Sequence, residues 1–326
     1  MAAMSRDKRF SPVSEEEIKQ TVKDSFGYHA EVKTYSLIGN GVSNTSYLIE
    51  LLGEKTRYVI RFAPVSKEHL FEFEKGMLAA EPILCNRMAK RGIPVPKVVV
   101  VDCSFKSVNR EYSIVEYIEG CKDHAELSQN SKNEMLTQLG EITRDLHSIH
   151  HIKFGWPMPD GSVRGSSRWS DVMIEYVDEI CQRNSNLGLI DDTVLARFSR
   201  YIRQYRGMFD QVVIPSLVHN DIWEPNILIK MEDGRWTIAA LIDLERAIYA
   251  DPEYEYALWW NNPSFMKGYG KELDKSREGR NRRKAYAMIN HFYMVHTWIV
   301  HSEDPVQGEA CKKAGISALV ELENTP

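Results

Sequence analysis

Two neighbouring segments carry most of the information in this sequence: Ser216-Leu-Val-His219-Asn-Asp221-Ile-Trp-Glu-Pro-Asn226-Ile-Leu-Ile229, and Ile238-Ala-Ala-Leu-Ile-Asp243 shortly after it. Both segments contain short apolar runs bounded by polar and turn residues, which predicts β-strands. His219, Asp221 and Asn226 follow the spacing H-x-D-x-x-x-x-N, and Asp243 ends the second apolar run. The pattern therefore places a histidine, two carboxylates and an amide at the ends of two successive strands.

These side chains are the parts that phosphoryl transfer needs. A phosphoryl group in flight carries spread negative charge, so catalysis is mostly positioning and charge neutralisation. Mg²⁺ prefers oxygen ligands, so Asn226 and Asp243 are predicted to bind it. Asp221 is predicted to accept the proton of an incoming hydroxyl group, and His219 to brace the loop by hydrogen bonds. A plain β-hairpin with a polar loop is the alternative, but it does not explain the offsets of Asn226 and Asp243.

The chain resembles the aminoglycoside phosphotransferase family, relatives of choline kinases and fructosamine kinases. The resemblance lies in residues 219–226, in Leu241-Ile-Asp243-Leu-Glu, and in Tyr249-Ala-Asp251-Pro252. The family often has Gly where this chain has Asn220 and Ala250. The first departure could change a backbone conformation, because Gly tolerates positive φ more freely than Asn does.

The resemblance implies an α+β, two-lobed, protein-kinase-like fold. The small N-terminal lobe, expected over residues 1–117, would have an antiparallel sheet and one main helix and would bind the nucleotide. The larger, mostly helical C-terminal lobe, expected over residues 118–326, would carry catalysis and acceptor binding. ATP or GTP with Mg²⁺ is the expected cofactor, and Asp251 is expected to support the catalytic loop structurally.

Composition limits the other functions that this chain can have. The chain has 326 residues, 43% of them hydrophobic and 27% charged, with a net charge of −5. This acidic balance gives a nucleic-acid partner no electrostatic support. No apolar run is long enough to cross a membrane, and the polar, basic start is not that of a signal peptide. The 5 scattered cysteines are typical of reduced thiols, so a cytoplasmic protein is expected. Its expected assembly is a monomer or a homodimer.

The N-terminal part contains the expected nucleotide-binding residues. Ser14 and Glu17 form a capping-box pattern before a helix, and strands are predicted at residues 32–38, 46–52 and 58–62. The loop residues Ser43, Asn44 and Thr45 could present backbone N–H groups to phosphates, although an ordinary hairpin turn fits equally well. Arg61 stands where a protein kinase has the lysine of Val-Ala-Ile-Lys, and so is the candidate cation for the α- and β-phosphates. A solvent-facing arginine is the alternative.

A helix is predicted over residues 67–91, ended by Gly92 and Pro94. A kinase needs a glutamate on this helix to fix the strand cation. The resemblance favours Glu81, and Glu74 is the reserve. Because Pro82 removes a helical hydrogen bond, a restart of the helix near Glu81 is the alternative.

The strand that starts at Tyr112 runs to the link between the lobes. The resemblance implies that the peptide groups of Glu116, Tyr117 and Ile118 hydrogen-bond the adenine edge there. From the residues alone, this segment is a strand leaving a sheet.

A small-molecule acceptor is expected, because the short span between Asp243 and Tyr254 leaves little room for a peptide-docking platform. Glu253 and Glu255 could line a pocket for a polyamine-like substrate, while Trp259 could supply an aromatic wall for a sugar or a quaternary amine. An aminoglycoside or other hydroxylated antibiotic is the leading acceptor. The alternatives are a metabolic amino alcohol or sugar derivative, and a nucleotide-binding protein without catalysis.

Overall fold

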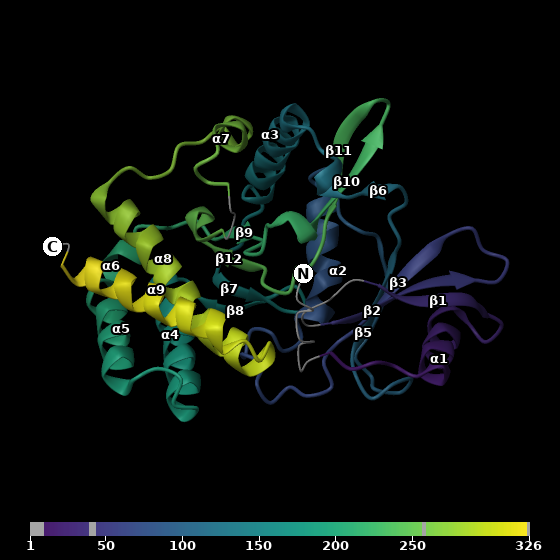
Figure 1. Ribbon diagram of the computed structural model, residues 1–326, viewed down its shortest axis with the longest axis horizontal. Helices are drawn as coiled ribbons and strands as arrows, with labels where there is room; N and C mark the ends of the chain where they lie inside the picture. Colours follow the sequence, from purple (N-terminus) through teal and green to yellow (C-terminus); the bar gives the residue numbers. More distant parts are fainter. Residues whose placement is uncertain (1–9, 39–43, 256–258, 325–326) are drawn as a thin grey trace.

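A five-stranded antiparallel sheet forms the N-terminal lobe of the computed structural model, which describes residues 10–38, 44–255 and 259–324 (Figure 1). The strand order is β1-β2-β3-β5-β4, with β1 (Val32–Ile38), β2 (Thr45–Leu51), β3 (Arg57–Phe62), β4 (Val98–Asp102) and β5 (Tyr112–Glu116). Residues alternate between buried and half-buried along β2 and β3, as in a sheet with one face on a core.

Helix α1 (Glu15–Phe26) covers that buried face. Its Ile18 and Val22 belong to the same apolar cluster as Tyr47 and Ile49 of β2. The predicted capping box is confirmed: the Ser14 hydroxyl accepts from the Glu17 backbone N–H, and the Glu17 carboxylate accepts from the Ser14 N–H.

The main helix of this lobe, α2 (Met77–Ala89), begins later than the predicted start near residue 67. The preceding residues form turns, because Phe71 and Phe73 cross to the C-terminal lobe and pack against its aromatic core. Phe73 stacks on Trp156, and Phe71 meets Tyr293 edge-on. The alternative of a helix restart near Glu81 does not apply either, because α2 runs from Met77 through Pro82, which only removes one helical hydrogen bond.

The C-terminal lobe combines two small sheets with most of the helices (Figure 1). One sheet has the order β11-β10-β6 and the other β8-β7-β12-β9. The strands are β6 (Cys121–Lys122), β7 (Phe154–Pro157), β8 (Val163–Ser166), β9 (Ser216–Val218), β10 (Ile227–Glu232), β11 (Arg235–Leu241) and β12 (Ile248–Ala250). The α-helices are α3 (Gln129–Leu146), α4 (Trp169–Asn186), α5 (Asp192–Gln204), α6 (Arg206–Phe209), α7 (Pro263–Tyr269), α8 (Arg277–His296) and α9 (Pro305–Glu323). A π-helical segment, η4 (Thr297–His301), extends α8, and short 3₁₀ turns are η1 (His124–Glu126), η2 (Glu224–Asn226) and η3 (Pro252–Tyr254).

Helices α3 and α7 pack unusually closely, and glycine is the reason. A Cβ on Gly140 would lie 2.1 Å from the Phe265 carbonyl oxygen, and one on Gly268 would lie 1.9 Å from the Thr137 carbonyl oxygen. Only glycine permits this approach of the two backbones. At the C-terminal ends of the two helices, the His147 Nδ1 accepts from the Tyr269 hydroxyl at 2.9 Å.

Within the described residues, every helix falls short of the length or the apolar character that crossing a bilayer requires.

Candidate active site

Strand β9 ends at Val218 and delivers the loop that carries Asp221. Asn226 lies in the following 3₁₀ turn, η2, and its Nδ2 donates to the Asp221 Oδ2 at 2.8 Å and to the Asp221 carbonyl oxygen at 3.0 Å. The Asn226 carbonyl oxygen Oδ1 therefore faces away from Asp221. The Nε2–H of His219 donates to the Ile242 carbonyl oxygen at 3.1 Å, so the loop is fastened to the backbone just before Asp243.

Two residues of this region have left-handed backbone conformations. Asn220 has φ +61° and Asp243 has φ +67°. Such conformations cost energy for residues other than glycine and persist where the surroundings impose them, often at functional sites. Asn220 stands where the resembling family often has Gly, and its positive φ explains the preference. Asn is among the side chains that tolerate this region best, and Asn220 also hydrogen-bonds the Tyr254 hydroxyl.

Arg61 is held between the two lobes. Its Nη1 donates to the Glu81 Oε1 at 2.6 Å, and its Nη2 lies 3.5 Å from the Asp243 Oδ1 and 3.3 Å from the Glu245 Oε1. Glu81, rather than Glu74, is thus the glutamate that forms the ion pair with Arg61. Glu74 instead accepts from the Tyr293 hydroxyl at 2.9 Å.

The charges at this point favour a cation. Burial raises the pKa of Asp243, and the neighbouring Asp221 and Glu81 carboxylates raise it further, against the opposing effect of Arg61. Carboxylate and amide oxygens in this arrangement suit a hard divalent ion such as Mg²⁺. The sequence motif does not indicate a role for Glu245. In the structure, its position two residues after Asp243 brings its carboxylate to 3.3 Å from Arg61.

The three residues predicted to cover the phosphates, Ser43, Asn44 and Thr45, have different positions relative to the site. Ser43 lies outside the described residues. The Asn44 Nδ2 donates to the Glu245 carboxylate, which connects the loop to the site. Thr45 belongs to β2, and its buried hydroxyl exchanges hydrogen bonds with the Ser11 backbone at 3.0 and 3.2 Å. The Thr45 side chain therefore faces the N-terminal segment, because its strand position points it to the face that this segment covers.

The link between the lobes follows β5. The backbone N–H of Glu116 donates to the Lys97 carbonyl oxygen, and that of Tyr117 donates to the Arg57 carbonyl oxygen, both at 2.9 Å. These two N–H groups are therefore already used in hydrogen bonds to neighbouring strand segments. The Ile118 carbonyl oxygen lies 3.3 Å from the Cys121 Sγ, at the turn into the C-terminal lobe.

Glu255 lies behind the loop that follows β9 and carries Asp221, so the expectation that Glu255 lines an acceptor pocket is wrong. Its side chain is 0% exposed. Its oxygens accept from the backbone N–H of His219 at 2.8 Å and of Asn220 at 2.5 Å. The Nε2–H of His147, at the end of α3, donates to the same carboxylate at 3.2 Å, and the His147 Nδ1 accepts from the Tyr269 hydroxyl at 2.9 Å. A surface acceptor cannot reach Glu255 there.

The other acceptor candidates are also engaged inside the protein. Glu253 accepts from Arg283 at 2.5 Å and from the Asp274 backbone N–H at 2.5 Å. Trp259 is partly buried against the apolar cluster that contains Phe265. The acidic pocket expected for a polyamine is therefore not formed by Glu253 and Glu255. Sequence spacing did not reveal this, because both side chains are recruited by elements distant in the chain.

Replacing Glu255 with Gln is expected to lower both stability and turnover. An amide offers one oxygen, so its NH₂ would face a backbone N–H or His147. Leaving such a buried donor unsatisfied costs ~1–3 kcal/mol. Urea unfolding and steady-state kinetics would measure the two effects, with Glu272→Gln on the exposed surface as the matched control. Wild-type stability and kcat in Glu255→Gln would refute a loop-holding role.

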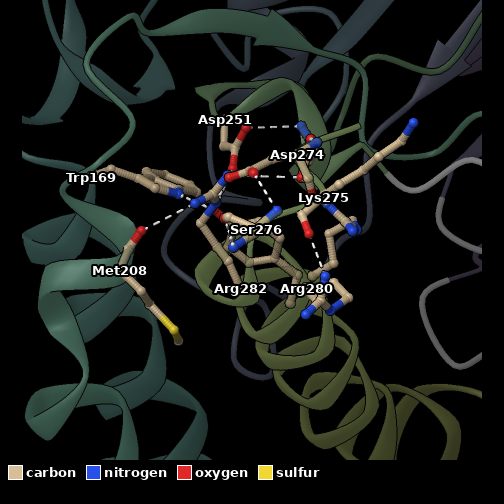
Figure 2. A network of polar contacts seen from close by, with 12 residues as sticks. Trp169, Met208, Asp251, Asp274, Lys275, Ser276, Arg280 and Arg282 are labelled. Carbon is tan, nitrogen blue, oxygen red and sulfur yellow. Dashed lines mark hydrogen bonds and ion pairs between the residues drawn. The ribbon is translucent and has the colours of Figure 1, made fainter. Parts of the chain in front are cut away.

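Asp251 anchors the segment that carries Glu255. Figure 2 shows Asp251 in one polar network with Trp169 and Arg282. Its Oδ1 caps η3 by accepting from the Glu253 backbone N–H at 3.0 Å. Its Oδ2 accepts from the Arg282 Nε at 2.7 Å and from the Tyr286 hydroxyl at 2.9 Å. Trp169 adds a hydrogen bond from its Nε1 to the Tyr286 oxygen at 2.7 Å. Asp251 and Arg282 are buried, so this network holds η3 against α8 from the inside.

An open hollow adjoins the site on the side of Asn44 and Glu245. Its wall also includes Ala63, Lys67 and Glu74. No set of at least three His, Cys, Asp or Glu side chains arranged to hold a metal ion by themselves occurs in the described part of the chain. A metal here would depend on ligands such as Asn226 and on the phosphates of a nucleotide.

Comparison with known proteins agrees with this geometry. The family model described as "Phosphotransferase enzyme family" matches residues 34–286. A search of curated protein sequences gave no match. Among solved structures, a thermostable mutant of aminoglycoside phosphotransferase APH(4)-Ia, in complex with AMP-PNP and hygromycin B, is 18% identical. That comparison covers 95% of this chain and 100% of the other, with a TM-score of 0.67.

Two further similar structures bind or are assigned other substrates. A protein of Thermobifida fusca, assigned as a fructosamine-3-kinase, is 16% identical over 96% of this chain and 100% of its own, with a TM-score of 0.66. A complex of an APH(2'') enzyme with GDP and kanamycin is 14% identical over 95% of this chain and 99% of its own, with a TM-score of 0.62. The predicted two-lobed, protein-kinase-like fold is thus confirmed.

Proposed function

Because the chain belongs to the phosphotransferase enzyme family and is a small-molecule kinase, we propose that it transfers the γ-phosphoryl group of ATP to a hydroxyl group, with Asp221 as the general base. The observation that carries this proposal is the convergence of Asp221, Asn226, Asp243 and Arg61, from both lobes, on one site. A protein that only binds nucleotides has no need of a carboxylate held as Asp221 is.

In the proposed mechanism, the acceptor hydroxyl donates its hydrogen to Asp221 as its oxygen attacks the γ-phosphorus. Asn226 and Asp243 would hold Mg²⁺, which neutralises charge on the triphosphate when bound. Asn226 also orients Asp221 through its Nδ2, so one amide would serve the base and the metal site together.

The nucleotide would lie between the lobes. Arg61, fixed by Glu81, is proposed to orient the α- and β-phosphates with its permanent charge. The backbone of Asn44 and Thr45 would cover the phosphates. Because the Glu116 and Tyr117 N–H groups donate within the sheet, the carbonyl oxygens of residues 116–118 and the Ile118 N–H would meet the base of ATP, or of GTP. In this proposal, residues 1–117 bind the nucleotide and residues 118–326 supply the catalytic and acceptor sites.

The acceptor is proposed to be a hydroxylated metabolite such as a sugar derivative, with an aminoglycoside as the second candidate. Similar structures hold hygromycin B or kanamycin, which supports the second. The first is favoured because Glu253 and Glu255, the acids expected to receive a polycation, are bound by Arg283, His147 and backbone N–H groups. Antibiotic resistance would follow only from the second candidate.

A turnover assay tests the proposal directly. Purified protein with ATP or GTP and Mg²⁺ is expected to phosphorylate at least one member of a panel of sugars, sugar acids, amino alcohols and aminoglycosides. Removal of Mg²⁺ with EDTA should abolish the transfer. If thermal-shift assays show Mg·ATP binding but no panel member is phosphorylated, the protein is a nucleotide binder and the proposed activity is wrong.

A further inference from the structure

An arginine that the proposed mechanism does not use lies beside Asp221. Arg246 is in the segment between Asp243 and β12, and its Nη1 is 3.7 Å from the Asp221 Oδ1. The two side chains are only 17% and 22% exposed, so both charges lie largely buried beside each other. A charge this deeply placed is costly to desolvate, which favours a specific use for it.

The guanidinium group is held in place by helix α8. Its Nη2 donates to the Asn290 Oδ1 at 2.9 Å, and its central carbon lies 5.0 Å from the centre of the Tyr293 ring. The Tyr293 hydroxyl in turn donates to Glu74. Stacking and a fixed fork preorganise an arginine to recognise a planar anion.

The two carboxylate oxygens of Asp221 have different neighbours, and this difference indicates which substrate Arg246 faces. Asn226 donates to Oδ2. The Asn226 backbone carbonyl oxygen accepts from the Ile242 N–H at 3.0 Å, next to Asp243, which lies 3.5 Å from Arg61 on the proposed nucleotide side. Arg246 is next to the other oxygen, Oδ1. In a kinase the base stands between the nucleotide and the acceptor, so the Oδ1 side is where the acceptor hydroxyl would arrive.

We propose that Arg246 binds a carboxylate group of the acceptor, so that the substrate is a hydroxy acid such as a sugar acid. This inference rests on the proposed phosphotransfer. A hydroxyl group donating to Oδ1 would stand ~2.7 Å from it. A carboxylate one or two bonds from the hydroxyl-bearing carbon would then meet the guanidinium group, which approaches the same oxygen.

The reaction balances with these residues. The acceptor oxygen forms a bond to the γ-phosphorus while the bond from that phosphorus to the bridging oxygen of ATP breaks, and ADP leaves. The hydroxyl proton passes to Asp221. The acceptor carboxylate stays ionised and unchanged against Arg246 throughout. An acceptor with an ammonium group in that position would meet a like charge instead.

Acceptors matched in carbon skeleton test the proposal. Gluconate, glucitol and 1-amino-1-deoxyglucitol share one open carbon chain and differ only at C1, which is a carboxylate, a neutral hydroxymethyl group or an ammonium-bearing methylene group. Glycerate, glycerol and 3-aminopropane-1,2-diol repeat this series on three carbons. The wild type is expected to show a kcat/KM at least ~10-fold higher for a carboxylate than for its neutral partner, a difference that one charge-assisted contact can supply. In Arg246→Gln this ratio should fall to near one, mainly through KM. Arg246→Lys should keep part of it, and Arg197→Gln, a surface change at an exposed ion pair, should leave the ratio as it was.

Calorimetry separates this inference from the proposed function. Gluconate and glucitol are titrated into the full-length protein loaded with Mg²⁺ and a non-hydrolysable ATP analogue. Carboxylate binding that is lost in Arg246→Gln supports the inference even if no acceptor is phosphorylated, in which case only the proposed transfer fails. Equal binding of gluconate and glucitol to the wild type would overturn the inference. So would an equal loss of kcat for every acceptor in Arg246→Gln, which would mean that Arg246 only positions Asp221.

Discussion

Asp221→Asn is expected to reduce the turnover number for phosphoryl transfer by ~10²–10⁴-fold, the usual contribution of a general base. The amide keeps the shape of the carboxylate and can still contact Asn226. It cannot take the proton of the acceptor hydroxyl, which must leave as the bond to phosphorus forms. Steady-state kinetics with the best acceptor would measure the loss.

Nucleotide affinity is the control for this variant. Since the proposed ligands of Mg·ATP are Asn226, Asp243 and Arg61, calorimetry should find the dissociation constant of Mg·ATP nearly unchanged in Asp221→Asn. Asp178→Asn, at an exposed ion pair with Arg203, should alter neither quantity. If kcat in Asp221→Asn stays within a few-fold of the wild type, Asp221 is not the base.

The parts of the site that sequence could predict are those set by short-range spacing. The offset between Asp221 and Asn226 fits one turn of chain, and the hydrogen bond between them follows from it. Arg61 can be predicted because it belongs to the alternating pattern of a strand, at the position where a protein kinase has its lysine. The preference for Glu81 over Glu74 comes from the family resemblance. The contact of Arg61 with Glu81 agrees with that choice.

The residue positions that the sequence could not predict are set by contacts with elements distant in the chain. Phe73 has helical spacing with Leu70 and Met77, but Phe71 and Phe73 both pack into the aromatic core of the other lobe, and the helix begins only after them. Glu255 reads as a surface acid, yet the backbone N–H groups of the catalytic loop and His147 take it into the interior. Arg246 carries no motif, and only the fold shows that it lies beside Asp221.

Arg282→Met is expected to have the largest effect on stability. The Arg282 and Asp251 side chains are 6% and 5% exposed, and the change would leave Asp251 buried without its cation. Breaking a buried pair in this way costs ~3–5 kcal/mol. Urea unfolding followed by circular dichroism would measure the loss. Arg283→Met, which removes a more exposed partner of Glu253, is the matched control and should cost less.

A double variant would test whether the lost stability comes from the buried Asp251 carboxylate that has lost its partner Arg282. Asp251→Asn combined with Arg282→Met removes both charges and should be less destabilised than Arg282→Met alone. A double variant that is as unstable as the sum of the single changes would contradict this account. Function should follow stability, because Asp251 fixes the turn that carries Glu255 to the catalytic loop, while Arg282 lies on α8, the helix that supplies Asn290 and Tyr293 to Arg246. Loosening this one network would therefore disturb the proposed base and the proposed acceptor contact together.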